Sequence, residues 1–177
     1  MYEYHIELSE KDYIDFNKYH LLHSESGKKA IRINQMLFPI ISVILLFLIW
    51  FFNRDLHLLL IEGIVLGIIS VIMFFLTKGM LLKKIEKHIT KLKKEGKLPF
   101  NQKSILTFDE DGIHEKTANT ETKTNYTLIE KIIESDETIY VYIGAVQAII
   151  IPKDCYIADH SIDELLVYLN EKTKLNR

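Results

Sequence analysis

The chain has 177 residues, of which 48% are hydrophobic, and a formal net charge of −2 at pH 7. This length allows one or two small domains. The single cysteine, Cys155, excludes an intramolecular disulfide and fits a reducing compartment. The apolar residues are concentrated in one block that follows a charged segment. No small-residue cleavage pattern follows the first apolar run, so we expect no secretory signal peptide.

The amino-terminal segment predicts a strand followed by a helix. Apolar and charged residues alternate from Tyr2 to Leu8, which is the period of a half-buried strand. Residues 9–12 read as a capping box that opens a helix. The predicted face of this helix carries Tyr13, Phe16, His20 and Leu21. His20 and His23 are three residues apart, but no further ligands accompany them, so we predict no metal site.

Two apolar runs follow, at residues 36–52 and 56–76, and the polar residues 53–55 separate them. At 1.5 Å per residue, each run covers most of a hydrocarbon core about 30 Å thick. The rest of so small a chain cannot cover two fully buried helices of this length. The pattern therefore predicts a transmembrane hairpin over residues 36–76 in a lipid bilayer.

The basic residues predict the orientation of this hairpin. Lys28, Lys29 and Arg32 precede the first run, and a series of lysines from Lys78 to Lys97 follows the second. The connecting loop offers only Arg54, which Asp55 offsets. Because Lys and Arg accumulate on the cytoplasmic side, we expect a plasma-membrane protein with both termini in the cytoplasm.

Three residues inside the second run are candidates for intramembrane packing or polar function. Glu62 can act as a proton relay or ion site, or it can snorkel, be protonated, or pair with Arg54 or His57. Gly63 and Gly67 form a small-residue stripe that permits close helix packing. This stripe can pack against the first run or form a homodimer.

Residues 79–97 predict an amphipathic, basic helix that ends at Gly96 and Pro99. Two interpretations fit its apolar stripe: a helix lying on anionic lipid headgroups, or a stalk packed on the amino-terminal helix. The stretch lacks interleaved aromatic residues, so we expect no nucleic-acid binding. The candidate anionic-lipid contacts are Lys83, Lys84, Lys87, Lys91 and Lys94.

From Lys103 onward the pattern predicts β structure. Strands are expected at residues 104–108, 112–116, 120–126, 139–143 and 148–151. Residues 109–112 form the first turn, and residues 129–134 predict a bridging strand or a short helix. A second capping box at residues 161–164 opens a final amphipathic helix. This order is that of a pleckstrin-homology-like domain, and the strand at residues 2–8 can complete its sheet across the hairpin.

Particular residues resemble one known family. They are Phe108 to Ile113, Tyr126, Ile129, Glu134 and the run from Ala148 through Ile151-Pro152-Lys153 to Tyr156. The chain resembles the YcxB-like protein family in these motifs, and Tyr4 to Phe16 and the paired apolar runs resemble it too. In this family a large aromatic residue, often Trp, is expected at the position of Tyr126. Phe is commoner than Tyr at the position of Tyr156. The resemblance implies a bacterial membrane protein with a cytoplasmic domain related to pleckstrin-homology-like modules, and it implies no activity.

The remaining polar residues predict no catalytic site and no cofactor. Cys155 has no evident base unless His160 lies nearby. The acidic residues 109–111 can hold a cation, but a turn at Gly112 explains them better. Pro152 ends a strand because it lacks an N–H donor. Lys153 then lies at the sheet edge, either in a structural role or as a partner contact.

The sequence therefore predicts an α+β membrane protein. It consists of a strand and helix at residues 1–35, the hairpin at 36–76, a basic stalk at 77–99 and a cytoplasmic pleckstrin-homology-like antiparallel β domain, capped by a helix, at 100–177. We expect a non-catalytic interaction or regulatory module with a possible protein partner or homodimer. The alternatives are an immunity or stress-protection protein against a membrane-active toxin, and a subunit of an oligomeric pore or transporter.

Overall fold

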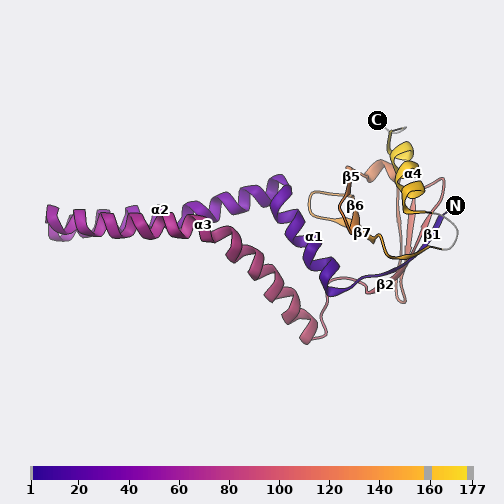
Figure 1. Ribbon diagram of the computed structural model, residues 1–177, viewed down its shortest axis with the longest axis horizontal. Coiled ribbons are helices and arrows are strands. Elements are labelled where there is room, and N and C mark those ends of the chain that lie inside the picture. Colours follow the sequence, from indigo (N-terminus) through magenta and orange to yellow (C-terminus); the bar gives the residue numbers. More distant parts are fainter. Residues whose placement is uncertain (1, 158–160, 175–177) are drawn as a thin grey trace. The chain divides into compact units, whose positions relative to one another are not determined.

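The computed structural model describes residues 2–157 and 161–174. Contacts between residues divide the chain into two compact units. Residues 1–17 and 89–177 form the first, which holds all of the strands and is called the β unit. Residues 18–88 form the second, which is entirely helical and is called the helical unit (Figure 1).

Three long helices lie wholly or partly in the helical unit. Helix α1 spans Glu10–His23, α2 spans Glu25–Asn53 and α3 spans Leu56–Lys94. Ser24 caps α2, because its Oγ accepts a hydrogen bond from the N–H of Gly27 at 2.9 Å. A Cβ atom at Gly27 would lie only 2.3 Å from a backbone oxygen of α1, so glycine is needed where α1 turns into α2.

A tight turn joins α2 to α3. Arg54 adopts the left-handed conformation, with φ of 52°, and its N–H donates to the carbonyl of Trp50 at 3.0 Å. Asp55 then caps α3, because its Oδ1 accepts from the N–H groups of His57 and Leu58 at 2.9 and 3.3 Å. The polar break predicted at residues 53–55 is thus the loop of a helical hairpin.

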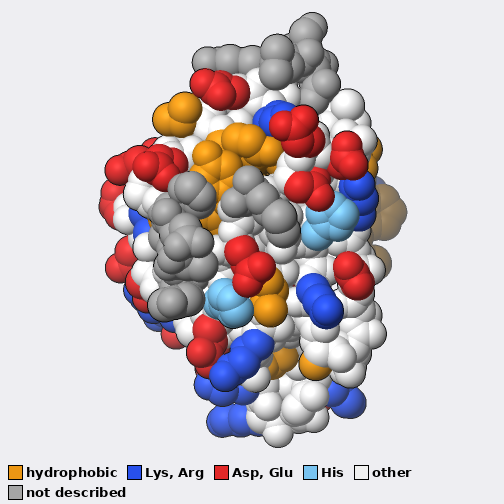
Figure 2. Space-filling view, turned by 90° about the vertical axis from the view of Figure 1, so that its right-hand side faces the viewer, with side chains coloured by type: hydrophobic (Ala, Val, Ile, Leu, Met, Phe, Trp, Pro, Cys, Tyr) orange, Lys and Arg blue, Asp and Glu red, His pale blue; other side chains and the backbone are white. Residues whose placement is uncertain are grey.

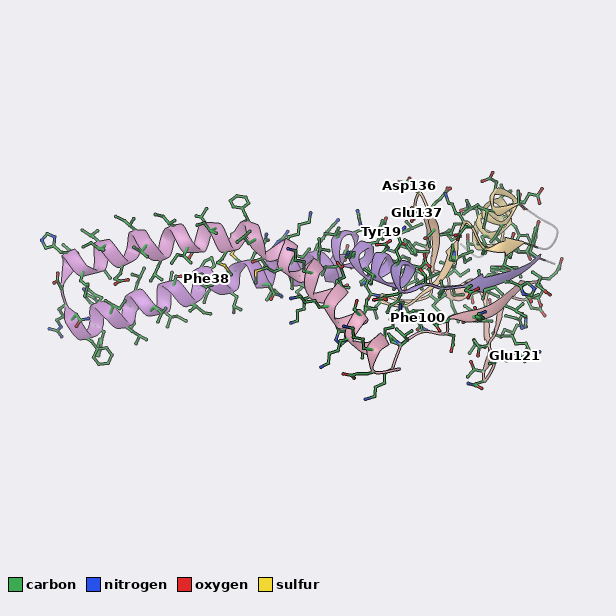
Figure 3. All side chains as sticks on the ribbon, turned by 60° about the horizontal axis from the view of Figure 1, so that its bottom comes forward. Tyr19, Phe38, Phe100, Glu121, Asp136 and Glu137 are labelled. Carbon is green, nitrogen blue, oxygen red and sulfur yellow. The ribbon has the colours of Figure 1, made fainter. Side chains whose placement is uncertain are left out.

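The apolar side chains of the hairpin face outward along its length. The most hydrophobic stretch of each helix is only 6% buried, and both helices are long and apolar enough to cross a membrane. The core helix of a soluble protein would be covered by other elements. Figure 3 shows side chains projecting along both helices, with Phe38 labelled on α2.

Polar contacts join the two hairpin helices. The hydroxyls of Ser42 and Ser70 lie 3.0 Å apart, and the amide of Gln35 donates to the carbonyl of Phe74 at 3.1 Å. Small hydroxyl side chains permit close approach and supply hydrogen bonds in an apolar medium. These two contacts define the register in which α2 and α3 run antiparallel.

The β unit contains two antiparallel sheets and a carboxy-terminal helix. The first sheet has the strand order β4-β3-β2-β1-β8, and the second has the order β5-β6-β7. The strands of the first sheet are β1 Tyr2–Glu7, β2 Lys103–Phe108, β3 Ile113–Lys116, β4 Glu121–Thr124 and β8 Tyr156–Ile157. The other elements are the 3-10 turn η1 Tyr126–Leu128, β5 Lys131–Glu134, β6 Thr138–Tyr142, β7 Ala148–Pro152 and α4 Ile162–Lys174.

Strand β1 lies inside the first sheet, although the hairpin separates it from the rest of that sheet in sequence. It pairs with β2 over its whole length, from Tyr2 opposite Phe108 to Glu7 opposite Lys103. Its other edge pairs with β8, where Tyr4 lies opposite Ile157. The hypothesis that the amino-terminal strand completes the sheet across the hairpin is therefore confirmed.

The inner faces of the two sheets and one face of α4 enclose the hydrophobic core. Alternate residues of β1 and β2 point inward, as the pleat requires. Completely buried side chains come from the strands of both sheets and from α4: Tyr4, Phe108, Ile139, Val141, Ile151, Leu165 and Leu169. The predicted face of the final helix is confirmed at Leu165 and Leu169.

The start of α1 covers the outer face of the second sheet. Phe16 is 6% exposed, and its ring lies 5.5 Å from that of Tyr140 and 6.0 Å from that of Tyr142. Every residue of β6 is consequently buried, because the core covers one face and α1 the other. The predicted capping box holds this helix: the Asp12 carboxylate accepts from the Ser9 N–H at 2.8 Å, and Ser9 Oγ accepts from the Asp12 N–H at 3.2 Å.

The α+β class and the antiparallel sheets agree with the prediction. The continuing helix predicted after the second apolar run is also confirmed, because α3 runs without a break to Lys94, and Gly96, with φ of +67°, follows its end. Residues 131–134 form a strand, which settles the alternative left open for that stretch. Strand β8 was not predicted, because two residues are too few to show an alternating pattern. The predicted boundaries after residues 35, 76 and 99 stay predictions.

Candidate functional site

Glu62 is half-buried on α3, and no residue of the described chain forms an ion pair or a hydrogen bond with it. The predicted pairing with Arg54 or His57 is therefore not formed. His57 precedes Glu62 by five residues, whereas side chains on a helix meet at spacings of three or four. Arg54 lies in the turn before the helix begins.

Gly63 and Gly67 do not pack against α2. A Cβ atom added at either glycine would meet no atom within 4 Å. Ser70, one turn further along the same stripe, does contact Ser42, so the stripe meets α2 at Ser70 and not at the two glycines. Glycine permits close approach but does not enforce it, so the two glycines present an open surface on α3.

The five lysines proposed as lipid contacts lie on the last turns of α3 and are all exposed. They are Lys83, Lys84, Lys87, Lys91 and Lys94. Lys91 lies 3.8 Å from Glu95, in an i,i+4 pair. The other four form no ion pair with a described carboxylate. Lipid contact itself stays a prediction.

The end of α3 packs on α1, as the stalk interpretation predicts. In the β unit, the Glu10 carboxylate accepts from the Thr90 hydroxyl at 2.6 Å and from Lys93 Nζ at 2.8 Å. These donors, Lys93 first, hold the pKa of Glu10 below its usual value. Ile89, on the predicted apolar stripe, is only 3% exposed.

Lys153 has partners within the chain. Its Nζ donates to Glu134 at 2.6 Å, its backbone N–H donates to the carbonyl of Glu137 at 2.9 Å, and its side chain is only 26% exposed. The two bonds tie the end of β7 to β5 and to the turn after it. The contacts favour the structural role of Lys153 over a partner contact.

The acidic residues after β2 form a turn. Asp109 Oδ1 accepts from the N–H groups of Asp111 and Gly112 at 2.8 and 3.0 Å. The first of these bonds is the main reason why the pKa of Asp109 is lowered. His114 Nε2 lies 3.0 Å from Asp109 Oδ2 without hydrogen-bond alignment. The described residues contain no cluster of three potential metal ligands.

The backbone oxygen of Asp109 also accepts two tyrosine hydroxyls. Tyr126 donates to it at 2.8 Å and Tyr168 at 2.6 Å. Burial is the main cause that raises the pKa of Tyr126, so its hydroxyl stays a donor at physiological pH. These bonds connect η1 and α4 to the β2–β3 turn. An aromatic donor at position 126 is thus part of the scaffold.

Cys155 lines a pocket of about 810 Å³ on the β unit, next to His5, Lys103 and Lys116. Burial raises the pKa of its thiol to about 11, with Asp154 as a smaller cause. A thiol with this pKa is protonated at neutral pH and is a poor nucleophile. The base proposed for it, His160, lies outside the described residues.

A second pocket of the β unit lies between its two sheets and is called the groove. Its volume is about 450 Å³. Aromatic and aliphatic residues from α1, from the segment before β2 and from β7 form its apolar walls: Tyr13, Phe16, Phe100, Ile149 and Ile150. Tyr13 and Phe100 stack with ring centroids 4.5 Å apart. Val146, in the β6–β7 turn, lines it and is 68% exposed.

The groove exposes the edge of β7, which is a terminal strand of its sheet. The N–H of Glu130 donates to Tyr142, so the backbone groups of Tyr142 point toward β5. In an antiparallel sheet this direction alternates, so Val141 and its partner Ile149 bond to each other. The backbone groups of Ala148 and Ile150 consequently point away from β6. The groove thus combines apolar walls with a strand edge.

One family model matches this part of the chain, from the last residue of β2 into α4. Residues 108–166 match the model of the YcxB-like protein family. The resemblance based on the motifs from Phe108 to Tyr156 is thereby confirmed. No curated protein and no solved structure matches the chain.

The YcxB-like domain contains most of the groove but not the whole fold. Strands β3 to β8 lie inside the matched residues, whereas β1, α1, the hairpin and most of β2 lie outside them. The groove was missed in the sequence because its walls come from segments far apart in the chain.

Proposed function

We propose that the protein is a membrane-anchored, non-catalytic interaction module whose β unit lies in the cytoplasm. The pairing of β1 with β2 carries this proposal. The two strands lie on opposite sides of the hairpin in sequence, yet they share one sheet. A hairpin that crosses a membrane twice returns the chain to its starting side, so the sheet can form only if both flanks are on that side. The basic flanks identify this side as the cytoplasm.

Labelling of single cysteines tests this topology. In a Cys155→Ser background, Asn53→Cys in the hairpin turn should react with a membrane-impermeant maleimide on intact cells. Glu95→Cys, just after α3, should react only after the cells are permeabilised. Labelling of Glu95→Cys in intact cells would contradict the proposed orientation.

The proposed fold of the β unit is pleckstrin-homology-like. Apart from the inserted helices α1 to α3 and the short strand β8, the antiparallel strands β1 to β4, the antiparallel strands β5 to β7 and the helix α4 follow one another in this order. Recognition of phosphoinositides is not part of the proposal. Acidic side chains lie among the basic ones on the face of the molecule shown in Figure 2, and a surface of mixed charge does not attract anionic headgroups strongly.

The partner that we propose for the groove is a protein with an extended segment. An extended chain can bond to the free backbone groups of Ala148 and Ile150 and place alternate side chains between the apolar walls. The edge supplies affinity and the walls supply selectivity. This arrangement needs no catalytic group.

Site-specific crosslinking in native membranes tests the groove as the docking site. A photoreactive residue at Val146, on the groove, should capture a protein. The same residue at Val167, an exposed valine of α4 that does not line the groove, should not. Ala148→Pro removes one free N–H without breaking the β6–β7 ladder and should abolish capture from position 146. Equal capture from both positions would refute this site.

A second candidate function is that of a subunit of an oligomeric pore or transporter. The open surface at Gly63 and Gly67 favours it, because small residues that face outward permit contact with a second copy. Glu62 would then supply a polar group inside the assembly. Ion or proton flux into reconstituted vesicles should fall in Glu62→Gln, and unchanged flux would exclude this function.

A further inference from the structure

Basic side chains gather at one end of the hairpin, from both of its helices. On α2 they are Lys28, Lys29 and Arg32, and on α3 they are Lys78, Lys83, Lys84 and Lys87. All seven are exposed, and all belong to the helical unit. We call these residues the basic collar.

The register of the hairpin places the two groups at the same level. Gln35 bonds to Phe74, and Ser42 bonds to Ser70. Because the helices are antiparallel, Arg32 lies at the level of Lys78 when this register is continued. Lys28 and Lys29 lie at the level of Lys83 by the same continuation.

Charge pairing distinguishes the basic collar from most other lysines. No collar residue forms an ion pair with a carboxylate among the residues that the structure describes. In contrast, Lys11, Lys18, Lys93, Lys103, Lys123 and Lys153 each have an acidic partner. The collar therefore carries positive charge that the described protein does not neutralise.

We propose that the basic collar binds the anionic phospholipid headgroups of the leaflet from which the hairpin emerges. This proposal rests on the proposed function, since it requires the hairpin to span the bilayer. The apolar run of α3 ends at Leu76. Measured along the helix, Lys78 lies about 3 Å, Lys83 about 10 Å and Lys87 about 16 Å beyond this point.

These heights match the headgroup layer and its electrostatic reach. The layer is about 5–8 Å thick on each side of the core, and the Debye length at physiological salt is about 8 Å. Lys91 and Lys94, at about 22 and 27 Å, lie beyond this reach. Of the five lysines predicted from sequence, only Lys83, Lys84 and Lys87 thus belong to the lipid-binding set.

Spin-labelled lipids test the basic collar in the full-length protein. The chain is reconstituted in phosphatidylcholine with phosphatidylglycerol, and the motionally restricted fraction of each labelled lipid is measured. The restricted fraction of phosphatidylglycerol at the wild-type protein should exceed that of phosphatidylcholine by about fivefold or more. A fivefold preference corresponds to about 1 kcal/mol, the effect of one lysine near an anionic surface. The preference should fall in 1 M salt.

Two triple variants that remove equal charge, one from α3 and one from its end and the turn that follows, locate the contact. K83Q/K84Q/K87Q should lose most of the preference, and K91Q/K94Q/K97Q should keep it. An equal loss in both variants, or no preference in the wild type, would overturn the proposal. A chain that resists carbonate extraction but shows no preference refutes the collar alone. A chain that carbonate releases refutes the membrane anchor as well.

Discussion

Gly112 shows how closely the β unit is packed at the scale of single residues. It follows the Asp109 turn, and its backbone lies against β4. A Cβ atom at this position would lie 2.4 Å from the carbonyl oxygen of Thr124. The neighbour is backbone held in a sheet, so it cannot move aside as a side chain does.

Gly112→Ala should therefore lower the free energy of unfolding of the β unit by about 2 kcal/mol or more. The matched control is Gly144→Ala, because a Cβ atom there meets nothing within 4 Å. The control should change stability by no more than about 0.5 kcal/mol. Thermal melting of the detergent-solubilised chain measures both, and equal melting temperatures would contradict this account of Gly112.

The Asp109 turn should also make stability depend on pH. The folded pKa of Asp109 is lowered, chiefly by the N–H of Asp111. A carboxyl of this kind stabilises the fold above its unfolded pKa of about 4, and the effect is lost as the pH falls through the folded pKa. Asp109→Asn should therefore melt below the wild type at pH 7, and the difference should shrink as the pH falls below about 4.

The exposed neighbour Glu110 supplies the control for this pH dependence. Glu110→Gln removes the same charge from the same turn and should leave the melting curve nearly unchanged at every pH. A constant difference between Asp109→Asn and the wild type from pH 7 to pH 3 would show that the amide, not the lost charge, destabilises the variant.

The sequence predicted some of these residues and could not predict others. The Asp109 turn was predictable because Asp and Gly at these spacings have local conformational preferences. The open surface at Gly63 and Gly67 was not, because periodicity identifies a helix face but not the neighbour that the face meets. The ion pair of Lys153 with Glu134 depends on strand pairing that no local pattern reveals.

At the scale of elements, β1 is an internal strand that pairs with a neighbouring strand at each of its edges. It contributes Tyr4 and Ile6 to the core and bonds to both β2 and β8. Its outward residues, Glu3 and Glu7, are exposed. The β unit thus depends on a strand that the hairpin separates from the other strands.

Alanine substitution of the inward residues of β1 and, separately, of its outward residues tests how much each set contributes to the stability of the β unit. Tyr4→Ala with Ile6→Ala should cost about 5 kcal/mol or more and make residues 89–177 sensitive to protease. Glu3→Ala with Glu7→Ala should leave the protease resistance of this segment intact. Resistance that persists in the first variant would show that the carboxy-terminal part folds without β1.

Elements with a long periodic pattern were predictable, and short ones were not. Both apolar helices, the alternation of β1 and the two capping boxes appeared in the sequence because each repeats a local rule over many residues. Strand β8 has two residues and forms only because β1 offers it an edge. The continuity of α3 through Gly79 was predictable, because a glycine inside a helix weakens it without ending it.

At the scale of the whole molecule, the hairpin is an insertion in a domain that is otherwise continuous. Residues 18–88 form a unit of their own, and every strand belongs to the other unit. The predicted division at residues 35, 76 and 99 follows composition. The contacts instead join the first 17 residues to the carboxy-terminal part, which composition cannot show.

Excision of the helical unit should yield a soluble, folded protein. Residues 1–17 joined to residues 89–177 by a Gly/Ser linker of roughly ten residues keep all the strands and the Glu10–Lys93 pair. This chain should melt cooperatively, and residues 89–177 alone should aggregate. An unfolded fusion would contradict the independence of the β unit.

The position of β1 also sets the timing of events on the ribosome. Its first partner, β2, starts at Lys103, so β1 leaves the ribosome well before any partner exists. At about 5–20 residues per second, this interval is on the order of ten seconds. Under the proposed topology, the hairpin inserts into the membrane within this interval, before β1 meets β2. The charges at Glu3 and Glu7 keep the waiting strand from pairing with other nascent chains.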